Sequence, residues 1–122
     1  MTEPALQVVA YRDVAGREPF QIWFDLLERQ AAAKVATVLT RLAQGNLSEV
    51  KPVGAGVLER RIDWGPGYRV YFGRDGECLV VLLCGGTKRR QQRDIAAAHR
   101  LWADYKARRE DRGEKLRRPG HG

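Results

Sequence analysis

The sequence predicts a small α+β domain, in which a small antiparallel or mixed sheet packs against helices in the order β-α-α-β-β-β-α. Three stretches in the second half have the alternating or continuous apolar pattern of strands and are separated by turn sequences. Two earlier stretches and one later stretch have the spacing of amphipathic helices. The length of 122 residues suits one domain, expected over 1–108, followed by a flexible basic tail over 109–122.

The first half is expected to hold one strand and two helices. Residues 6–11 are rich in β-branched and aromatic side chains, which favour a strand. Pro19 suits the first position of a helix because its missing N–H needs no partner there. A second apolar stripe follows and stops near Gly45, which is typical of a helix end. Residues 47–56 have no periodicity, so we expect a loop.

Three strands are predicted in the second half, and a last helix follows them. The strands cover residues 57–63, 68–73 and 78–84. The sequence Asp75-Gly76 between the last two is a strong hairpin signal. The third strand is apolar throughout, so both its faces should be covered and it should lie inside the sheet. The last helix is expected from about residue 90 to 108, with one apolar side.

The chain is basic, with 22 Lys and Arg against 15 Asp and Glu and a net charge of +7. Such an excess attracts polyanions, although a solubilising surface explains the composition equally well. No apolar run is long enough to cross a bilayer, and the N-terminus has acids where a signal peptide has a basic and then an apolar stretch. We therefore expect a cytoplasmic protein with no membrane partner.

Alternation along the predicted strands places charged side chains together. Arg69 and Tyr71 point away from the apolar face of their strand, and Glu59 and Arg61 do so in the preceding strand. Because neighbouring antiparallel strands align these rows, we expect an open face with guanidinium groups, a carboxylate and an aromatic ring. An ordinary half-solvated sheet shows the same alternation, and a Glu59–Arg61 surface pair is the alternative.

Two further segments adjoin this face. After the third strand, two glycines are expected to let the chain turn closely, so that Lys88, Arg89 and Arg90 extend the positive surface. Trp64 lies in the turn between the first two of these strands, where it is expected to be exposed to RNA or a partner. No histidine is close in sequence to these residues, since His99 falls in the last helix. The proton donor for any acid–base chemistry is therefore not identified.

Four motifs within residues 54–95 carry a resemblance to a known family. They read G-V-x-E-x-R-I, G-P-G-Y-R-V-Y-F, L-L-x-G-G-x-K and K-x-x-Q-x-x-D-I. This stretch resembles the signature of the RelE/ParE toxin superfamily. Within it, the sequence is similar to the phage-derived and plasmid addiction module killer proteins and to the HigB host-inhibition toxins.

The resemblance implies the toxin of a type II toxin-antitoxin system, acting as a ribosome-dependent mRNA endoribonuclease without metal or cofactor. The expected step is attack of a ribose 2′-OH on the neighbouring phosphate. Glu59 is then the general base, and Arg61 and Arg69 stabilise the charge on the phosphorane. Lys88 or Arg89 steadies the leaving 5′ oxygen. The RNA-binding set implied is Tyr71, Arg89, Arg90 and Trp64.

Two other functions stay open. The ParE branch inhibits DNA gyrase instead of cutting RNA, and a basic module that binds RNA without toxicity would have the same surface. A toxin also implies a cognate antitoxin, usually of the helix-turn-helix type. Codon preference, the general acid, the antitoxin-binding surface, the oligomeric state and whether the toxin is active are not fixed by the sequence.

Overall fold

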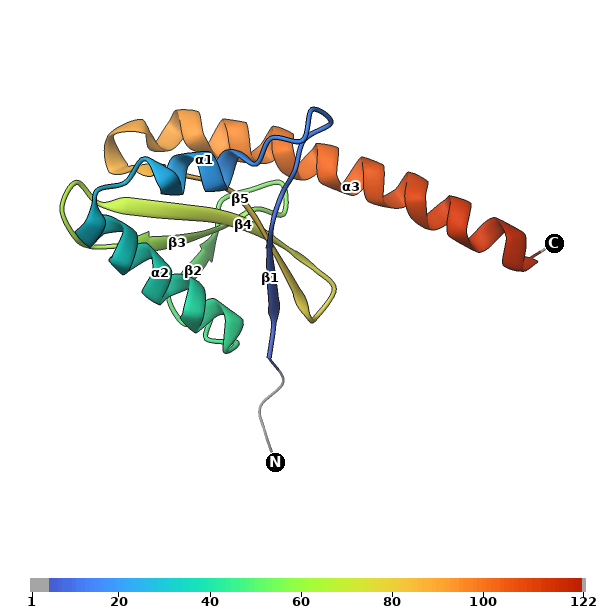
Figure 1. The fold of residues 1–122 in the computed structure, drawn as a ribbon, viewed down its shortest axis with the longest axis horizontal. Helices are drawn as coiled ribbons and strands as arrows, with labels where there is room; N and C mark the ends of the chain where they lie inside the picture. The colour runs from blue at the N-terminus through green and yellow to red at the C-terminus, as the bar shows by residue number, and fades with distance from the viewer. Residues whose placement is uncertain (1–4, 122) are drawn as a thin grey trace.

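The computed structural model describes residues 5–121, with side chains over 5–110. The expected α+β class is confirmed: a five-stranded mixed sheet with the order β1-β5-β4-β3-β2 is combined with three α-helices (Figure 1). The elements are β1 (Gln7–Ala10), α1 (Pro19–Asp25), α2 (Arg29–Ala43), β2 (Val50–Pro52), β3 (Leu58–Ile62), β4 (Tyr68–Asp75), β5 (Leu79–Thr87), the 3-10 turn η1 (Lys88–Arg90) and α3 (Gln91–His121).

Local sequence explains where the first helices begin. Pro19 occupies the start of α1, as its fixed φ and missing N–H predict. The carboxylate of Glu28 accepts hydrogen bonds from the backbone N–H groups of Gln30 and Ala31, which caps α2. Gly45 follows α2 with a φ of 85°, a left-handed conformation that favours glycine.

The sheet is antiparallel except at β1, which pairs in parallel with β5. The predicted loop over 47–56 contains the short strand β2, which pairs with β3 and sets Lys51 opposite Glu59. Three residues are too few to show a strand periodicity, so β2 depends on its partner rather than on a local pattern. As expected, β5 lies inside the sheet, and Val80 to Leu83 are buried.

Helices cover both faces of the sheet. On one face, side chains of α1 and α2 such as Phe20 and Leu42 pack against Val70 and Phe72. On the other face, Ala98 and Trp102 of α3 pack in a second core. The remaining members of this second core are Tyr11, Val57, Tyr71, Val81 and Leu83. The domain therefore has three layers, and α3 alone supplies the helical cover of the second face within the described side chains.

Glycines within the strands allow aromatic rings to lie against the backbone. The expectation that Gly85 begins a close turn is wrong, because β5 continues through Thr87. A Cβ on Gly85 would lie 2.3 Å from the ring of Trp23, and a Cβ on Gly73 would lie 2.6 Å from the ring of Trp102. These positions lack a side chain because a helix approaches the strand closely there.

The last helix is longer than predicted. After η1, α3 begins at Gln91 and runs to His121, past residue 108 where the sequence predicted its end. Figure 1 shows its C-terminal part extending away from the sheet. The predicted flexibility of the basic tail over 109–122 falls almost wholly on residues whose side chains lie outside the described part, so it stays a prediction.

Replacing Gly73 by alanine should destabilise the fold by about 1–3 kcal/mol, because the new methyl group collides with Trp102. Urea unfolding measures the change, with Ala103→Ser on the exposed side of α3 as a control. In a Trp102→Leu background the same substitution should cost less, since the ring is gone. Equal losses in both backgrounds would contradict this packing.

Candidate functional site

The structure brings Glu59, Arg61, Arg69 and Tyr71 to one face of the sheet, as the alternation predicts. In the β3–β4 register, Glu59 lies opposite Tyr71 and Arg61 lies opposite Arg69. The expectation that this face is open is wrong, because α3 covers most of it. Glu59 and Tyr71 are 0% exposed and Arg69 is 2% exposed, whereas Arg61 remains exposed.

The covered side chains form a buried cluster of Glu59, Arg69, Tyr71 and Gln91. Arg69 Nε lies 3.6 Å from Glu59 Oε2, and Gln91 Nε2 on α3 donates a hydrogen bond of 3.0 Å to the same oxygen. Lys51 Nζ approaches the other carboxylate oxygen from β2 at 3.9 Å. Glu59 is thus held by groups from β2, β4 and α3, and it neutralises a buried guanidinium.

The buried cluster is incompletely hydrogen-bonded. Among the described residues, Glu59 Oε1, Arg69 Nε and Tyr71 Oη are buried without a partner at hydrogen-bonding distance and angle. Burial, followed by the charge of Glu59, raises the pKa of Tyr71 far above its ordinary value, so its hydroxyl stays protonated. Unpaired buried polar atoms destabilise a fold, and here the Glu59–Arg69 ion pair and the hydrogen bond from Gln91 to Glu59 offset that cost.

The cations that α3 does not cover form a continuous basic surface. It is made by Lys34, Arg41, Arg60, Arg61, Lys88, Arg89, Arg90 and Arg93. Three adjoining hollows connect these side chains, one beside α2, one at the β3–β4 turn and one at η1. The hollows beside α2 and at the turn share Asp63, and the hollows at the turn and at η1 share Lys88. Among the residues that line them, only Glu49 and Asp63 are acidic. The surface is therefore strongly positive.

Backbone and ring contacts hold the parts of the basic surface together. The Lys88 N–H donates to the carbonyl of Gly67 at 2.8 Å, which fixes η1 against the β3–β4 turn. In that turn, the half-buried Trp64 stacks on Tyr68, with ring centroids 6.2 Å apart. The ammonium of Lys34 on α2 lies 5.9 Å from the Trp64 ring. The turn, η1 and α2 thus meet around Trp64.

Sequence reasoning missed the part of this surface that α2 and α3 supply. Lys34, Arg41 and Arg93 are exposed, and the apolar stripe of a helix indicates which side is buried but not what lies beside its exposed side. The signal was present, since Lys34 and Arg41 are seven residues apart and so share one helix face. Arg60 also belongs here: its guanidinium is nearly buried and lies 3.6 Å from Glu49.

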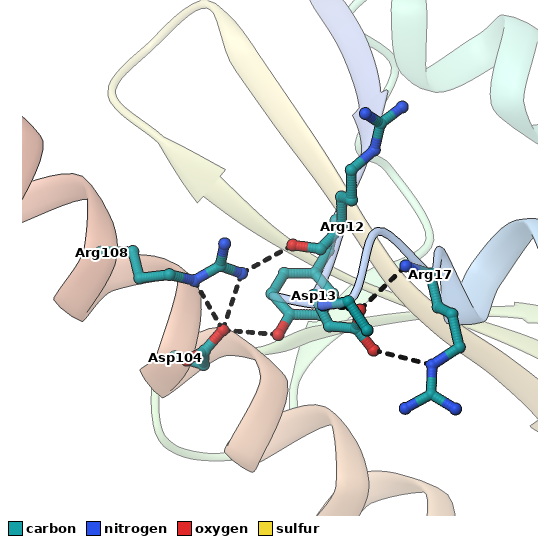
Figure 2. A network of polar contacts seen from close by, with 7 residues as sticks. Arg12, Asp13, Arg17, Asp104 and Arg108 are labelled. Carbon is teal, nitrogen blue, oxygen red and sulfur yellow. Dashed lines mark hydrogen bonds and ion pairs between the residues drawn. The ribbon is translucent and has the colours of Figure 1, made fainter.

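A separate hollow, of about 260 Å³, lies between the end of β1 and α3. Tyr11 and Arg108 line it, and both bond to Asp104 of α3 beside it: the carboxylate of Asp104 accepts hydrogen bonds from Tyr11 Oη at 2.5 Å and from Arg108 Nε at 2.9 Å (Figure 2). Arg108 also donates to the carbonyl of Arg12 at 2.6 Å. These bonds hold the pKa of Asp104 below its ordinary value. Because its charges are paired with one another, we assign this hollow a structural role, fastening α3 to β1.

The charged groups of the two regions differ in how they are paired. The arginines near β1 and the end of the sheet pair with carboxylates: Arg12 with Glu18, Arg17 with Asp13, Arg108 with Asp104 and Arg109 with Asp75. In the described part of the chain, Arg41, Arg61, Lys88 and Arg89 have no such partner within 4.0 Å. Arg29, Arg74, Arg100 and Lys106, which lie elsewhere, also lack such a partner there, but most of the unpaired cations of the described residues line the basic surface.

Two further properties restrict the kind of site present. Over the described residues, no three side chains from His, Cys, Asp and Glu are grouped so that they could hold a metal ion. Within the same residues, no helix combines the length and apolar character that crossing a membrane requires.

Fold and site together define a small α+β protein with a buried ionic cluster and an exposed basic surface. No family model matches the chain. It is 43% identical over 83 residues to an uncharacterized protein of Haemophilus influenzae, an alignment that covers 67% of this chain and 84% of that protein. The chain belongs to the same family as this Haemophilus protein.

Replacing Glu59 by alanine should destabilise the protein by about 3–5 kcal/mol, because Arg69 is left buried without its counter-charge. Glu77→Ala, in the exposed β4–β5 turn, is the matched control and should change stability by less than about 0.5 kcal/mol. Chemical unfolding compares the two. Equal stability of both variants would contradict the buried ion pair.

The bonds of Asp104 predict a pH dependence. A lowered pKa means that the ionised carboxylate stabilises the fold above its ordinary pKa of 3.8 and that this stabilisation is lost as the pH falls through the lowered value. Asp104→Asn should therefore melt below wild type at neutral pH, and the two melting temperatures should converge only as the pH falls below 3.8 and through the lowered pKa. A difference that does not change with pH would contradict this role.

Proposed function

We propose that this chain is the toxin of a type II toxin-antitoxin pair of the RelE/ParE superfamily, and that it acts on mRNA at the ribosome. Two kinds of observation support the proposal. The four sequence motifs resemble that superfamily, and an α+β fold of this size is what the resemblance implies. The observation that carries the choice of RNA as target is the gathering on the basic surface of most cations that have no carboxylate partner among the described residues, such as Arg61 and Lys88.

RNA suits this surface because its phosphates are closely spaced and bind cations by releasing condensed counterions. Arg61 and Lys88 lie on either side of the β3–β4 turn, both exposed and without carboxylate partners in the described part of the chain. Arg89 and Arg90 continue the surface on η1. Trp64 supplies an aromatic ring in the hollow that Lys88 also lines, and such a ring suits contact with an unpaired base.

Cleavage would follow the step that the resemblance implies. The 2′ oxygen forms a bond to the neighbouring phosphorus, the bond from phosphorus to the 5′ oxygen breaks, and a 2′,3′-cyclic phosphate and a 5′-OH result. The 2′-OH gives up a proton and the leaving 5′ oxygen takes one. Arg61 and Lys88 would stabilise the negative charge on the phosphorane, which is the role that preorganised cations have in phosphoryl chemistry.

The role of Glu59 is revised by its burial. A general base must come within hydrogen-bonding reach of the 2′-OH, and the Glu59 carboxylate is covered by α3 and bonded to Gln91. Glu59 can act as the base only if the first turn of α3 moves away from the sheet. In the arrangement described, Glu59 is the counter-charge of Arg69, and the same burial removes Arg69 and Tyr71 from contact with RNA.

This burial favours a second candidate, a toxin that binds its target without cutting RNA, such as the gyrase inhibitors of the ParE branch. The observation in its favour is that the one carboxylate expected to act as a base is 0% exposed. A basic module that binds RNA without toxicity would share this feature.

Substituting Arg61 or Lys88 by glutamine should lower mRNA cleavage in a translating extract by about 10²–10³-fold, since each removes a cation from the reacting phosphate. Both side chains are exposed, so the fold should be retained. The control is Arg17→Gln, which removes an equal charge from an exposed position near β1 and should cleave like wild type.

Two results would contradict the proposal. Wild type that inhibits gyrase supercoiling and yields no RNA product would select the second candidate. A loss of about 10²–10⁴-fold in a folded Glu59→Gln variant, with Arg61→Gln fully active, would place the chemistry beneath α3 instead of on the basic surface.

A further inference from the structure

The α2 end of the basic surface is not needed for a reaction at Arg61 and Lys88. It nevertheless carries exposed cations, which suggests a role in binding. Lys34, Thr37 and Arg41 line one side of a hollow whose other side is formed by Arg60 and Arg61 of β3. Lys34 and Arg41 are two helical turns apart, roughly 10 Å along the axis. Both are exposed, and neither has a carboxylate partner in the described part of the chain.

Trp64 joins this hollow to the rest of the basic surface. Asp63 of the β3–β4 turn lines both the α2 hollow and the next hollow, which Trp64 and Lys88 also line. Trp64 stacks on Tyr68, and its other contact of note is the ammonium of Lys34 at 5.9 Å. Lys34 is an exposed, flexible side chain whose contact with the ring is weak, so an incoming base can replace it.

We infer that the basic surface binds a single-stranded RNA segment along its whole length, from η1 over Trp64 to α2, where Lys34 and Arg41 contact phosphates outside the reacting position. The inference deepens the proposed function and rests on it. An aromatic ring flanked by cations is the arrangement that binds single strands, because each exposed base has a face to stack while the backbone follows the positive groups. A duplex keeps its bases stacked inside and cannot use Trp64 in this way.

The test is the affinity of the full chain for a fluorescent single-stranded RNA whose 2′ hydroxyls are methylated, so that it is not cut. The variant is Lys34→Gln/Arg41→Gln, and the control is Arg12→Gln/Arg17→Gln, which removes two positive charges near β1. Thermal melts confirm that both variants are folded. Titrations at several salt concentrations give the number of phosphate contacts.

We expect the Lys34→Gln/Arg41→Gln variant to bind at least tenfold more weakly. Its slope of log affinity against log salt should fall by about 1.4, since each contact with a single strand contributes about 0.7. The Arg12→Gln/Arg17→Gln control should bind within about twofold of wild type, with its slope unchanged. Trp64→Ala should weaken binding without changing the slope, because stacking releases no counterions.

Three results would overturn the inference. The first is an unchanged salt slope in the Lys34→Gln/Arg41→Gln variant, and the second is tighter binding of an RNA duplex than of the single strand. The third is equal affinity for poly-glutamate, which would show that the surface binds any polyanion. Failure of the proposed function is recognised separately. If wild type cuts mRNA in extract and cutting depends on Arg61, while the Lys34→Gln/Arg41→Gln variant binds RNA like wild type, the proposed function stands and only the RNA contacts of Lys34 and Arg41 are wrong. If wild type does not cut mRNA, the proposed function itself fails.

Discussion

The packing of α3 against the second face of the sheet is the constraint on which the rest of the structure depends. It supplies Ala98 and Trp102 to the second core, and it seals Glu59, Arg69 and Tyr71 from solvent. A carboxylate and a guanidinium that are buried together must neutralise each other. Because they are buried, Glu59, Arg69 and Tyr71 cannot contact a ligand in this arrangement. The exposed cations around Trp64 can.

Contacts along its length fix α3 in this position. Gln91 bonds to Glu59 at one end of the covered face. Further along, Asp104 bonds to Tyr11 and Arg108 in the network of Figure 2. Beyond Asp104, Arg109 pairs with Asp75 of β4 at 2.7 Å. The arginines of this region are thus used for structure, whereas those around the β3–β4 turn remain available. The cations around the β3–β4 turn are therefore the ones available to bind an anionic ligand.

Much of this arrangement could be predicted from the sequence. The alternation in β3 and β4 correctly placed Glu59, Arg61, Arg69 and Tyr71 on one face, because a strand fixes which side chains share a side. Alternation does not say what covers that side. The apolar stripe of the last helix was evident, but which face of the sheet receives it is decided by contacts between residues far apart in sequence, such as Gln91 with Glu59.

Other differences have the same origin. Gly85 was expected to serve a turn, but it makes room for the Trp23 ring from α1, a contact that no local pattern encodes. The short strand β2 exists because β3 offers it a partner. Lys34 joins the basic surface because α2 packs beside the β3–β4 turn. The local features of the candidate site were therefore predictable, whereas its burial and its full extent were not.

Hydrogen-deuterium exchange of the chain with and without the methylated single-stranded RNA tests most directly whether the basic surface is the working face. If the basic surface binds RNA, exchange of the backbone amides over residues 61–67 and 88–93 should be slower when RNA is bound. Exchange that is unchanged over these residues, with protection appearing instead around Tyr11 and Asp104, would contradict RNA binding at this surface.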